Sequence, residues 1–348
     1  MYTAFYGLSD RPFQLTPDAR FYFDSRTHKK AMAYLGYGLA QGEGFIVITG
    51  EVGAGKSTLV AHLMATIDRA RLNAVSIVST QVEGDDMLRL AAQKLGIETE
   101  GVAKARLLDL VEERLEEEAR SGKRSLLIVD EAQNLPHSAL EELRMLSNFT
   151  SGGRALLQIF LLGQPEFRDA VASPALEQLR QRVIATHHLE PMEANEVESY
   201  MLHRLALVGW EDRPRFDEAA FEAIYRHTDG IPRRVNQLAS RILLFAAMEQ
   251  LDAIDAEAVE AVAADMASDS PQERVLPLRV SPQPAAAAPS FERRSPPEPV
   301  ADFVLERRIA SLEARIEEQE HAVRRVLGLL IDWVESDQAP LSYRHNAA

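Results

Sequence analysis

Residues 50–57 read Gly50-Glu51-Val52-Gly53-Ala54-Gly55-Lys56-Ser57, a complete G-x-x-x-x-G-K-[ST] pattern. A β-branched apolar run at 45–49 precedes it, and residues 58–65 follow with apolar side chains at helical spacing. A strand, a glycine-rich loop and a helix in this order form the context in which the pattern predicts a phosphate-binding loop. We therefore expect this segment to bind a nucleoside triphosphate.

In a loop of this kind, backbone N–H groups and the positive end of the following helix surround the phosphates. Lys56 is expected to reach the β- and γ-phosphates, and Ser57 to ligate Mg²⁺. The ligands implied are thus ATP and Mg²⁺. The residues expected to bind ATP from this loop are Gly50, Glu51, Val52, Gly53, Ala54, Gly55, Lys56, Ser57 and Thr58.

A second buried-strand pattern, residues 125–129, ends in Asp130-Glu131. An acidic side chain at the tip of a strand beside the phosphate loop can hold Mg²⁺ through water, and Asp130 is expected to do so. Glu131 is then placed to accept a proton from the attacking water as general base. The competing interpretation is an acidic pair that opens a solvated loop. We favour catalysis, and with it hydrolysis of the nucleotide.

Composition narrows the class of protein. The chain has 348 residues, 46% of them hydrophobic and 26% charged, as in ordinary globular proteins. It has no cysteine, which excludes disulfides and cysteine nucleophiles and favours the reducing cytoplasm. The sequence predicts neither an export signal nor a membrane helix, which would need about 20 apolar residues. The net charge of -15 disfavours nucleic-acid binding.

The order of predicted elements indicates an α/β core followed by a helical domain. Helical patterns near 85–95, 104–120 and 137–149 alternate with strand patterns at 45–49, 74–79, 125–129, 155–162 and 183–189. Such alternation predicts a parallel sheet covered by helices. After residue 193 only helical patterns follow, at about 194–208, 216–228, 232–248 and 255–265. They predict a small all-helical lid.

The C-terminal part changes in composition. Residues 268–301 are rich in proline and lack apolar periodicity, which predicts an extended linker. Residues 302–335 carry a heptad pattern that predicts a coiled-coil helix, with a single docking helix as the alternative. Either form would recruit a protein partner or a second copy. The expected organisation is thus a core at 1–193, a lid at 194–267, a linker at 268–301, a helix at 302–335 and a tail at 336–348.

Further motifs follow in a fixed order. They read Asp-Glu-Ala-Gln-Asn at 130–134, Leu-Arg-Met-Leu-Ser-Asn at 143–148, Leu-Gly-Gln-Pro at 162–165, Gln-Arg-Val at 181–183 and Gly-Ile-Pro-Arg-Arg-Val-Asn at 230–236. The chain opens with Tyr-x-x-Phe-Tyr-Gly-Leu-x-x-x-Pro-Phe at 2–13. With this set, residues 1–265 resemble the AAA+ ATPases of the ExeA/GspA type. They look most similar to the XrtA/PEP-CTERM subfamily, which is linked to exosortase and exopolysaccharide loci in Gram-negative bacteria.

The resemblance implies a P-loop NTPase fold with a five-stranded parallel sheet, and it assigns further roles. Gln164 matches the sensor-1 position and would orient the attacking water, although Asn or Thr is commoner there. Arg233, with Arg234 as the weaker candidate, matches sensor 2 and would contact the γ-phosphate from the lid. Arg182 falls where an arginine finger for a neighbouring subunit is expected, with Arg180 as its rival and a surface salt bridge as the alternative. A finger that acts on a neighbour implies a homo-oligomer.

Histidines and aromatic residues near these motifs receive more modest interpretations. His187 and His188 alternate across a predicted strand, so we interpret both as structural. His28 is expected either to line the adenine pocket or to pack inside the protein. Six aromatic residues are expected to staple the first 23 residues onto the core beside the adenine: Phe5, Tyr6, Phe13, Phe21, Tyr22 and Phe23.

Three functions compete. The first is a cytoplasmic AAA+ ATPase that powers or regulates assembly of an envelope secretion, protein-sorting or exopolysaccharide system, and that contacts the inner membrane through its partners. The second is a DNA-associated ATPase of the transposition-helper or initiator type, for which a basic or winged-helix extension is expected after the lid. The third is a nucleotide-gated scaffold with slow turnover that acts through the heptad helix. The resemblance favours the first.

Overall fold

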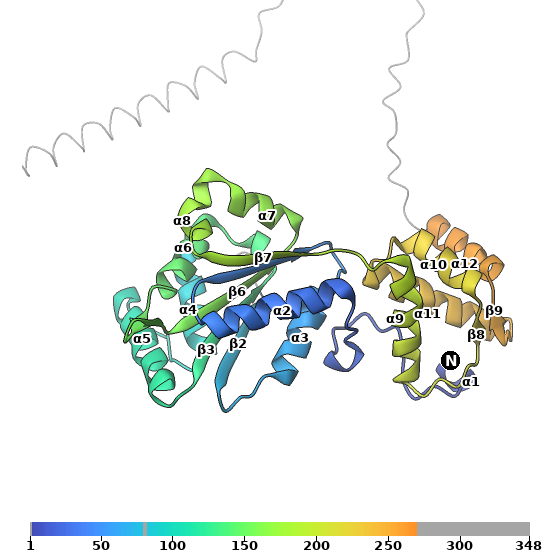
Figure 1. Cartoon of the computed structure of the whole chain (residues 1–348), viewed down its shortest axis with the longest axis horizontal. Helices are drawn as coiled ribbons and strands as arrows, with labels where there is room; N and C mark the ends of the chain where they lie inside the picture. The colour runs from blue at the N-terminus through green and yellow to red at the C-terminus, as the bar shows by residue number, and fades with distance from the viewer. Residues whose placement is uncertain (1, 79–81, 270–348) are drawn as a thin grey trace, which may run out of the picture. The chain divides into compact units, whose positions relative to one another are not determined.

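The computed structural model of the chain describes residues 2–78 and 82–269 (Figure 1). Its α/β part is built on a five-stranded parallel sheet with the order β2-β3-β6-β1-β7. The strands are β1 (Phe45–Gly50), β2 (Leu72–Val78), β3 (Arg124–Asp130), β6 (Leu157–Gly163) and β7 (Val183–Leu189). The parallel α/β fold that the sequence predicts is therefore confirmed.

Helices cover both faces of this sheet. One face carries α2 (Arg26–Gln41) and α3 (Lys56–Thr66). The other carries α4 (Gly84–Lys94), α5 (Lys104–Arg120), α6 (His137–Leu146), α7 (Pro165–Ala172) and the short α8 (Glu177–Arg180). Because both faces are covered, β1, β3 and β6 are buried nearly throughout, which explains their unbroken apolar runs.

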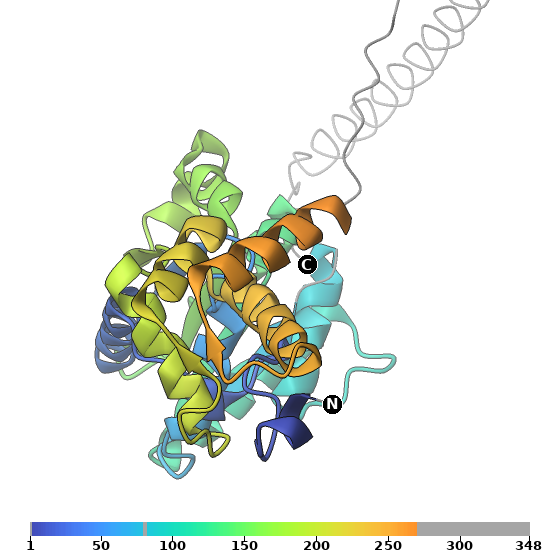
Figure 2. The same cartoon turned by 90° about the vertical axis from the view of Figure 1, so that its right-hand side faces the viewer.

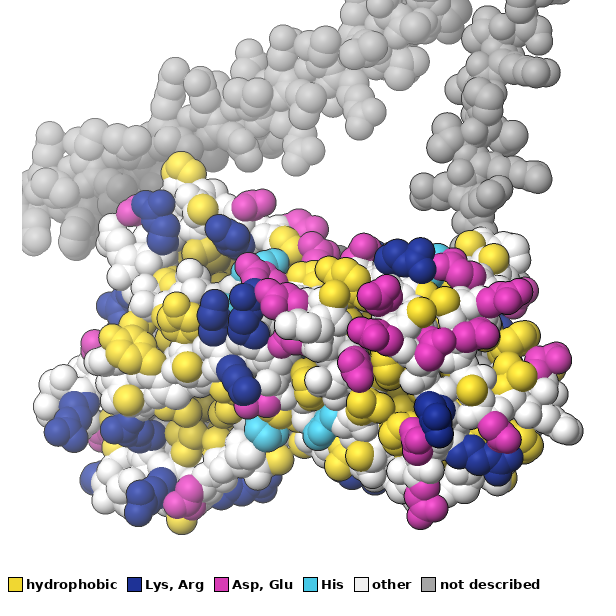
Figure 3. Space-filling view, turned by 45° about the vertical axis from the view of Figure 1, so that its right-hand side comes forward, with side chains coloured by type: hydrophobic (Ala, Val, Ile, Leu, Met, Phe, Trp, Pro, Cys, Tyr) yellow, Lys and Arg dark blue, Asp and Glu magenta, His cyan; other side chains and the backbone are white. Residues whose placement is uncertain are grey.

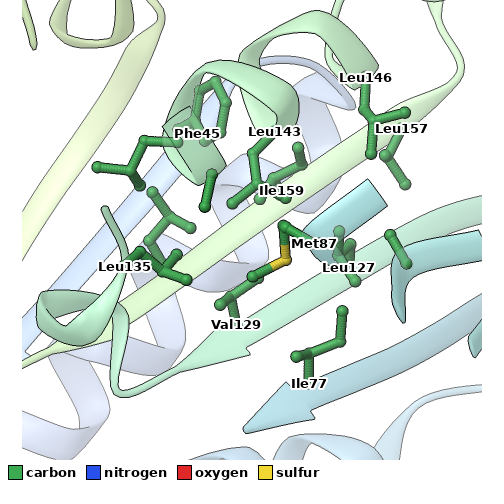
Figure 4. Close-up of a cluster of buried hydrophobic side chains, with 14 of the residues drawn as sticks. Phe45, Ile77, Met87, Leu127, Val129, Leu135, Leu143, Leu146, Leu157 and Ile159 are labelled. Atoms are coloured by element: carbon green, nitrogen blue, oxygen red, sulfur yellow. The ribbon is translucent and has the colours of Figure 1, made fainter. Parts of the chain in front are cut away.

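Side chains of one strand alternate between the two layers. Figure 4 shows the layer under α4 and α6, where Met87 and Leu143 meet Leu127, Val129 and Ile159 from the strands. The intervening strand residues point to the opposite layer and pack against α2 and α3. This packing fixes the register of the sheet, because a shift by one residue would exchange the two layers.

The spatial order of the strands determines which residues meet. β2 follows β1 in sequence but lies at the sheet edge, whereas β6 lies between β1 and β3. Thr49 pairs with Gly163, and Val129 pairs with Leu161, so the carboxyl ends of β1, β6 and β3 lie together. The loops that follow these three strands therefore converge at one edge of the sheet, where open α/β sheets bind ligands.

Among the residues that the structure describes, four helices follow the sheet, coloured yellow-green to orange in Figure 2. They are α9 (Ala194–Ala206), α10 (Glu218–Thr228), α11 (Pro232–Met248) and α12 (Ala256–Asp269). Their apolar faces form a separate buried cluster that includes Val197, Ile224, Val235, Leu243 and Val259. The helical lid expected from the sequence is thus present.

Small elements complete the described chain. They are α1 (Tyr2–Phe5), the 3-10 turns Ala19–Phe21, Ala132–Asn134 and Pro174–Leu176, and two pairs of short strands, β4 (Thr150–Ser151) with β5 (Arg154–Ala155) and β8 (Arg215–Phe216) with β9 (Ala253–Ile254). The β8–β9 pair corrects the expectation of an all-helical lid. A strand of two residues is too short to show a period in sequence, so pattern analysis did not detect it.

The N-terminal aromatic segment packs mainly on the lid and only partly on the core, which corrects in part the expectation that it is stapled to the core. Tyr6, Phe13 and Phe21 belong to the buried cluster of the lid. The guanidinium of Arg204 in α9 donates hydrogen bonds to the carbonyl oxygens of Pro12 (2.6 Å) and Gln14 (3.3 Å). Phe5 and Phe23 also pack against the lid cluster, whereas Tyr22 packs against the α2–α3 layer.

The linker from residue 270 onward and the heptad segment at 302–335 lie outside the described residues. Within residues 2–78 and 82–269, no helix is both long enough and apolar enough to cross a membrane.

Candidate nucleotide-binding site

The loop between β1 and α3 has the backbone of a phosphate cradle. Gly53 and Gly55 adopt φ values of 87° and 100°, in the left-handed region that favours glycine. A Cβ at Gly55 would lie 2.7 Å from Nε2 of His28, and one at Gly53 would lie 2.4 Å from Cβ of Arg233. Helix α3 begins at Lys56, so its free N–H groups face the loop.

Lys56 is the buried cation of this loop, 6% exposed. Its Nζ donates hydrogen bonds to the carbonyl oxygens of Gly50 (2.6 Å) and Glu51 (3.1 Å). Burial lowers the pKa of Lys56 below its ordinary value, and the carboxylates of Glu131 and Asp130 oppose that shift. An ammonium held by two neutral carbonyls can exchange them for phosphate oxygens, with which it forms stronger, charge-assisted bonds.

Ser57, in the first turn of α3, contacts Asp130, the last residue of β3. The hydroxyl of Ser57 donates a hydrogen bond to Oδ2 of Asp130 at 2.9 Å. A hydroxyl and a carboxylate in contact supply the hard oxygen donors that Mg²⁺ prefers. With the cradle and Lys56 beside them, the residues present fit both a triphosphate and its Mg²⁺.

A network of side chains surrounds Glu131, which directly follows β3. Its Oε2 accepts hydrogen bonds from Nε2 of Gln133 (2.5 Å) and Nε2 of Gln164 (3.4 Å). The structure thus brings Glu131 and Gln164 together, as the motif-based assignment requires. Sequence reasoning missed Gln133 as a site residue, although it belongs to the quoted 130–134 motif and lies only two positions after Glu131.

The two arginines at the start of α11 have different surroundings. The backbone N–H of Arg233 donates to the carbonyl oxygen of Gly53 at 3.2 Å, and Arg233 lines the cavity beside the loop. Arg234 instead forms an exposed ion pair with Asp229 at 2.9 Å. Arg233 is therefore the lid arginine that faces the phosphate loop.

Arg182 lies away from the site of its own chain. It precedes β7, and Val183 pairs with Phe45 at the opposite end of β1 from the phosphate loop. At about 3.3 Å per residue, that end lies roughly 16 Å from Gly50. Its guanidinium lies 3.4 Å from the carbonyl and hydroxyl oxygens of Ser147. The rival Arg180 forms an ion pair with Glu177.

A cavity opens beside the phosphate loop, between the N-terminal segment and the lid. Tyr22 and Tyr200 both line it, and the hydroxyl of Tyr200 donates to Oδ1 of Asn236 (2.8 Å). Tyr22 stacks on His62 of α3, with ring centroids 3.8 Å apart. The cavity is also lined by Gln14, Leu15, Phe21, Phe23, Met192 and Arg204. Such an aromatic-rich wall suits a planar base.

The sequence left the role of His28 open between lining an adenine pocket and packing inside the protein. His28 lines the cavity and lies buried against Gly55. Its Nδ1 lies 2.8 Å from the hydroxyl of Ser25, which precedes α2. Burial lowers the pKa of His28 to about 4, so its imidazole is neutral near pH 7. His28 therefore supports the phosphate loop as an uncharged side chain.

The two neighbouring histidines of β7 have structural partners. Nε2 of His187 lies 3.0 Å from the carbonyl oxygen of Thr27 in α2. Nδ1 of His188 lies 3.0 Å from the hydroxyl of Thr49 on the adjacent strand β1. Each ring thus ties β7 to a different neighbour.

Known proteins with similar sequence point to one class of ATPase. Residues 39–171 match the AAA domain family. Over 247 residues the chain is 36% identical to general secretion pathway protein A of Aeromonas hydrophila, a match that covers 71% of this chain and 45% of that protein. The chain thus spans about half the length of this relative.

Solved structures show the same fold at low sequence identity. The ORC2 protein of Aeropyrum pernix, in ADPNP-ADP complexes, matches with a TM-score of 0.56 at 17% identity, covering 74% of this chain and 72% of that one. Cdc6p from Pyrobaculum aerophilum matches with a TM-score of 0.55 at 18% identity, covering 74% and 71%. These likenesses establish a P-loop NTPase fold and nothing finer. The sequence matches, taken by themselves, make the chain similar to the AAA ATPases of the ExeA/GspA type.

Proposed function

We propose that the chain is a cytoplasmic, Mg²⁺-dependent ATPase that powers or regulates assembly of an envelope secretion, protein-sorting or exopolysaccharide system. The observation that carries this proposal is the 36% identity over 247 residues to a general secretion pathway protein. The convergence of Lys56, Ser57, Asp130 and Glu131 at one sheet edge supports it. The motif resemblance to the XrtA/PEP-CTERM subfamily supports the exosortase and exopolysaccharide setting.

In the proposed reaction, ATP lies between the phosphate loop and the lid. Lys56 and the N–H groups at 50–58 bind its phosphates, while Ser57 and Asp130, the latter through water, would hold Mg²⁺. When bound, Mg²⁺ neutralises charge that develops on the phosphates. Glu131 accepts a proton from the attacking water. Gln164, whose amide lies 3.4 Å from the same carboxylate, orients that water.

The lid takes part through Arg233. Its backbone touches Gly53 of the loop, so its side chain starts beside the phosphates. We infer that the guanidinium contacts the γ-phosphate and that loss of this phosphate releases α11 from the loop. Because α11 packs within the lid cluster, the whole lid would follow.

Arg182 is the residue through which assembly of an oligomer would affect ATP hydrolysis. This side chain is exposed and lies roughly 16 Å along the sheet from its own phosphate loop, so it can reach a nucleotide only in a neighbouring chain. We infer a homo-oligomer in which Arg182 acts as the finger. The heptad segment at 302–335 would recruit the protein partner that brings the ATPase to the inner membrane.

The test measures ATP turnover per subunit across a wide range of protein concentration, with Glu131→Gln as the blank. We expect specific activity to rise with concentration in the wild type but not in Arg182→Ala. Arg180→Ala, which removes the ion-paired neighbour, is the matched control and should behave like the wild type. A wild type no faster than the blank at every concentration would contradict the proposal in favour of a nucleotide-gated scaffold. Stimulation by duplex DNA would favour the DNA-associated alternative.

A further inference from the structure

One side chain, Gln133, connects the two groups to which the proposed function assigns the attacking water. It belongs to the 3-10 turn Ala132–Asn134, directly after Glu131. We propose that Gln133 is a positioning residue that sets the orientation of the Glu131 carboxylate and its distance from Gln164. The inference rests on the proposed function, since it takes Glu131 as the general base.

The amide of Gln133 uses both of its polar ends. Its Nε2 donates to Oε2 of Glu131 at 2.5 Å, and its Oε1 accepts from the backbone N–H of Gln164 at 3.0 Å. Nε2 of Gln164 closes the triangle by lying 3.4 Å from the same Oε2. Two amides thus converge on one carboxylate oxygen. Among the described residues no hydrogen bond reaches Oε1 of Glu131, so this oxygen is available to accept a proton.

The backbone of Glu131 shows why its side chain needs an anchor. Glu131 adopts φ 56° and ψ 39°, a left-handed conformation uncommon for residues other than glycine. Such conformations persist where the surroundings hold them, and they occur often at functional sites. Its N–H donates to Oδ1 of Asp130, and its carbonyl accepts from the N–H of Asn134. These bonds fix the backbone, while Gln133 fixes the carboxylate.

The amide of Gln133 also fixes the position of Gln164. Gln164 is the residue that precedes α7, whose first residue is Pro165. The hydrogen bond from its N–H to Gln133 ties this helix start to the turn that follows β3. Gln133 does not line the nucleotide cavity, whereas Glu131 and Gln164 do. Gln133 therefore acts on the reaction through these two residues and not through ATP.

Gln133→Ala is the first test, with kcat and KM for ATP measured separately. We expect kcat to fall about tenfold or more, because a free carboxylate samples unproductive rotamers, and KM to stay within about threefold. Gln133→Glu keeps an acceptor for the Gln164 N–H but loses the donor to Glu131, so its kcat should fall as well. Asn134→Ala, which removes an exposed side chain from the same turn, is the matched control and should keep the wild-type kcat.

The outcomes separate this inference from the proposed function. Wild-type kcat in Gln133→Ala, with turnover lost in Glu131→Gln, would overturn the role of Gln133 alone. Wild-type kcat in Glu131→Gln would instead overturn the base assignment. A raised KM with unchanged kcat would also contradict positioning, because it would show a role in binding ATP.

A double-mutant cycle on thermal unfolding tests the contact without any turnover. The variants are Glu131→Ala, Gln133→Ala and the pair together, in the full chain. We expect the shifts in Tm to be non-additive, since either single change removes the same hydrogen bond. Additive shifts would show that the two side chains do not depend on each other, and would overturn the inference.

Discussion

The core and the lid contribute to the nucleotide site by different means. The core supplies backbone geometry and the ends of strands, with Gly53 and Gly55 shaping the cradle and α3 starting at Lys56. The lid supplies side chains on packed helices, such as Tyr200 and Arg233. Their surfaces differ as well, because acidic side chains gather over the helical part in Figure 3 while Lys and Arg are more frequent over the α/β part. Substitutions in the core should therefore have the largest effects on kcat and on phosphate binding. Substitutions in the lid should have smaller effects.

The largest effect is expected at the end of β3. Glu131→Gln should lower kcat on the order of a thousandfold, because a general base contributes roughly 10²–10⁴ in rate. ATP affinity should hardly change, since the phosphate contacts remain. Phosphate release and binding of a fluorescent ATP analogue measure the two effects. Glu98→Gln, an exposed carboxylate remote from the loop, is the control. A wild-type rate in Glu131→Gln would place the base elsewhere.

Lys56→Ala tests the phosphate loop, the second contribution of the core. Its ammonium is the buried cation of the cradle, so ATP affinity should fall about a hundredfold, or about 2.7 kcal/mol. Isothermal titration with ATP measures this loss, and a melting curve checks that the variant folds. Lys94→Ala, at the exposed end of α4, should bind like the wild type. Equal affinities of all three proteins would mean that the triphosphate does not lie on this loop.

His28 links core stability to pH. Its pKa is about 4 in the folded protein against an ordinary 6.5, so the unfolded chain binds more protons between these values. The contribution of neutral His28 to the free energy of unfolding is therefore fully present above pH 6.5, and it falls as the pH drops toward 4. The loss at pH 5 should be roughly 2 kcal/mol.

The measurement for His28 is denaturant unfolding at pH 7.5 and pH 5. His28→Gln should lose less stability than the wild type on acidification, because it has no imidazole to protonate. His137→Gln, at an exposed position, is the control and should follow the wild type. An identical pH response of all three proteins would contradict burial of a neutral His28.

The smallest effect is expected in the lid. Arg233→Ala should weaken ATP binding about tenfold, or about 1.4 kcal/mol, and ADP binding less, because the proposed contact is to the γ-phosphate. Arg234→Ala is the matched control, since the neighbouring arginine pairs with Asp229. Titrations with ATP and with ADP measure the two affinities for each variant. Equal losses for ATP and ADP in Arg233→Ala would contradict γ-phosphate sensing.

The sequence predicts the core well because its signals are local. The ends of the apolar runs that predict the strands lie within two residues of the ends of the observed β1, β2, β3, β6 and β7. The phosphate loop and Asp130-Glu131 each follow such a run, so their meeting at the carboxyl edge follows from a parallel sheet. The order of strands does not follow, because nothing in the run of β6 shows that it lies between β1 and β3.

Contacts between distant segments account for what sequence analysis missed. The aromatic segment at 2–23 packs mainly on a lid that follows some 200 residues later in the chain. Its composition alone is compatible with packing on either the core or the lid. The stacking of Tyr22 on His62 and the bonds from Arg204 to Pro12 depend on tertiary packing in the same way. Gln133 differs, since it is close to Glu131 in sequence. Its role emerges only when β6 brings Gln164 beside the same carboxylate.

We propose that one ATP lies between the core loop and the lid arginine, Arg233. The most direct measurement is a crystal structure of the Glu131→Gln full chain with ATP and Mg²⁺, because this variant should keep its nucleotide intact. We predict that Nζ of Lys56 leaves the carbonyls of Gly50 and Glu51 for phosphate oxygens, and that Arg233 contacts the γ-phosphate. A triphosphate bound away from residues 50–58, or a Lys56 still bonded to both carbonyls beside bound ATP, would contradict the account.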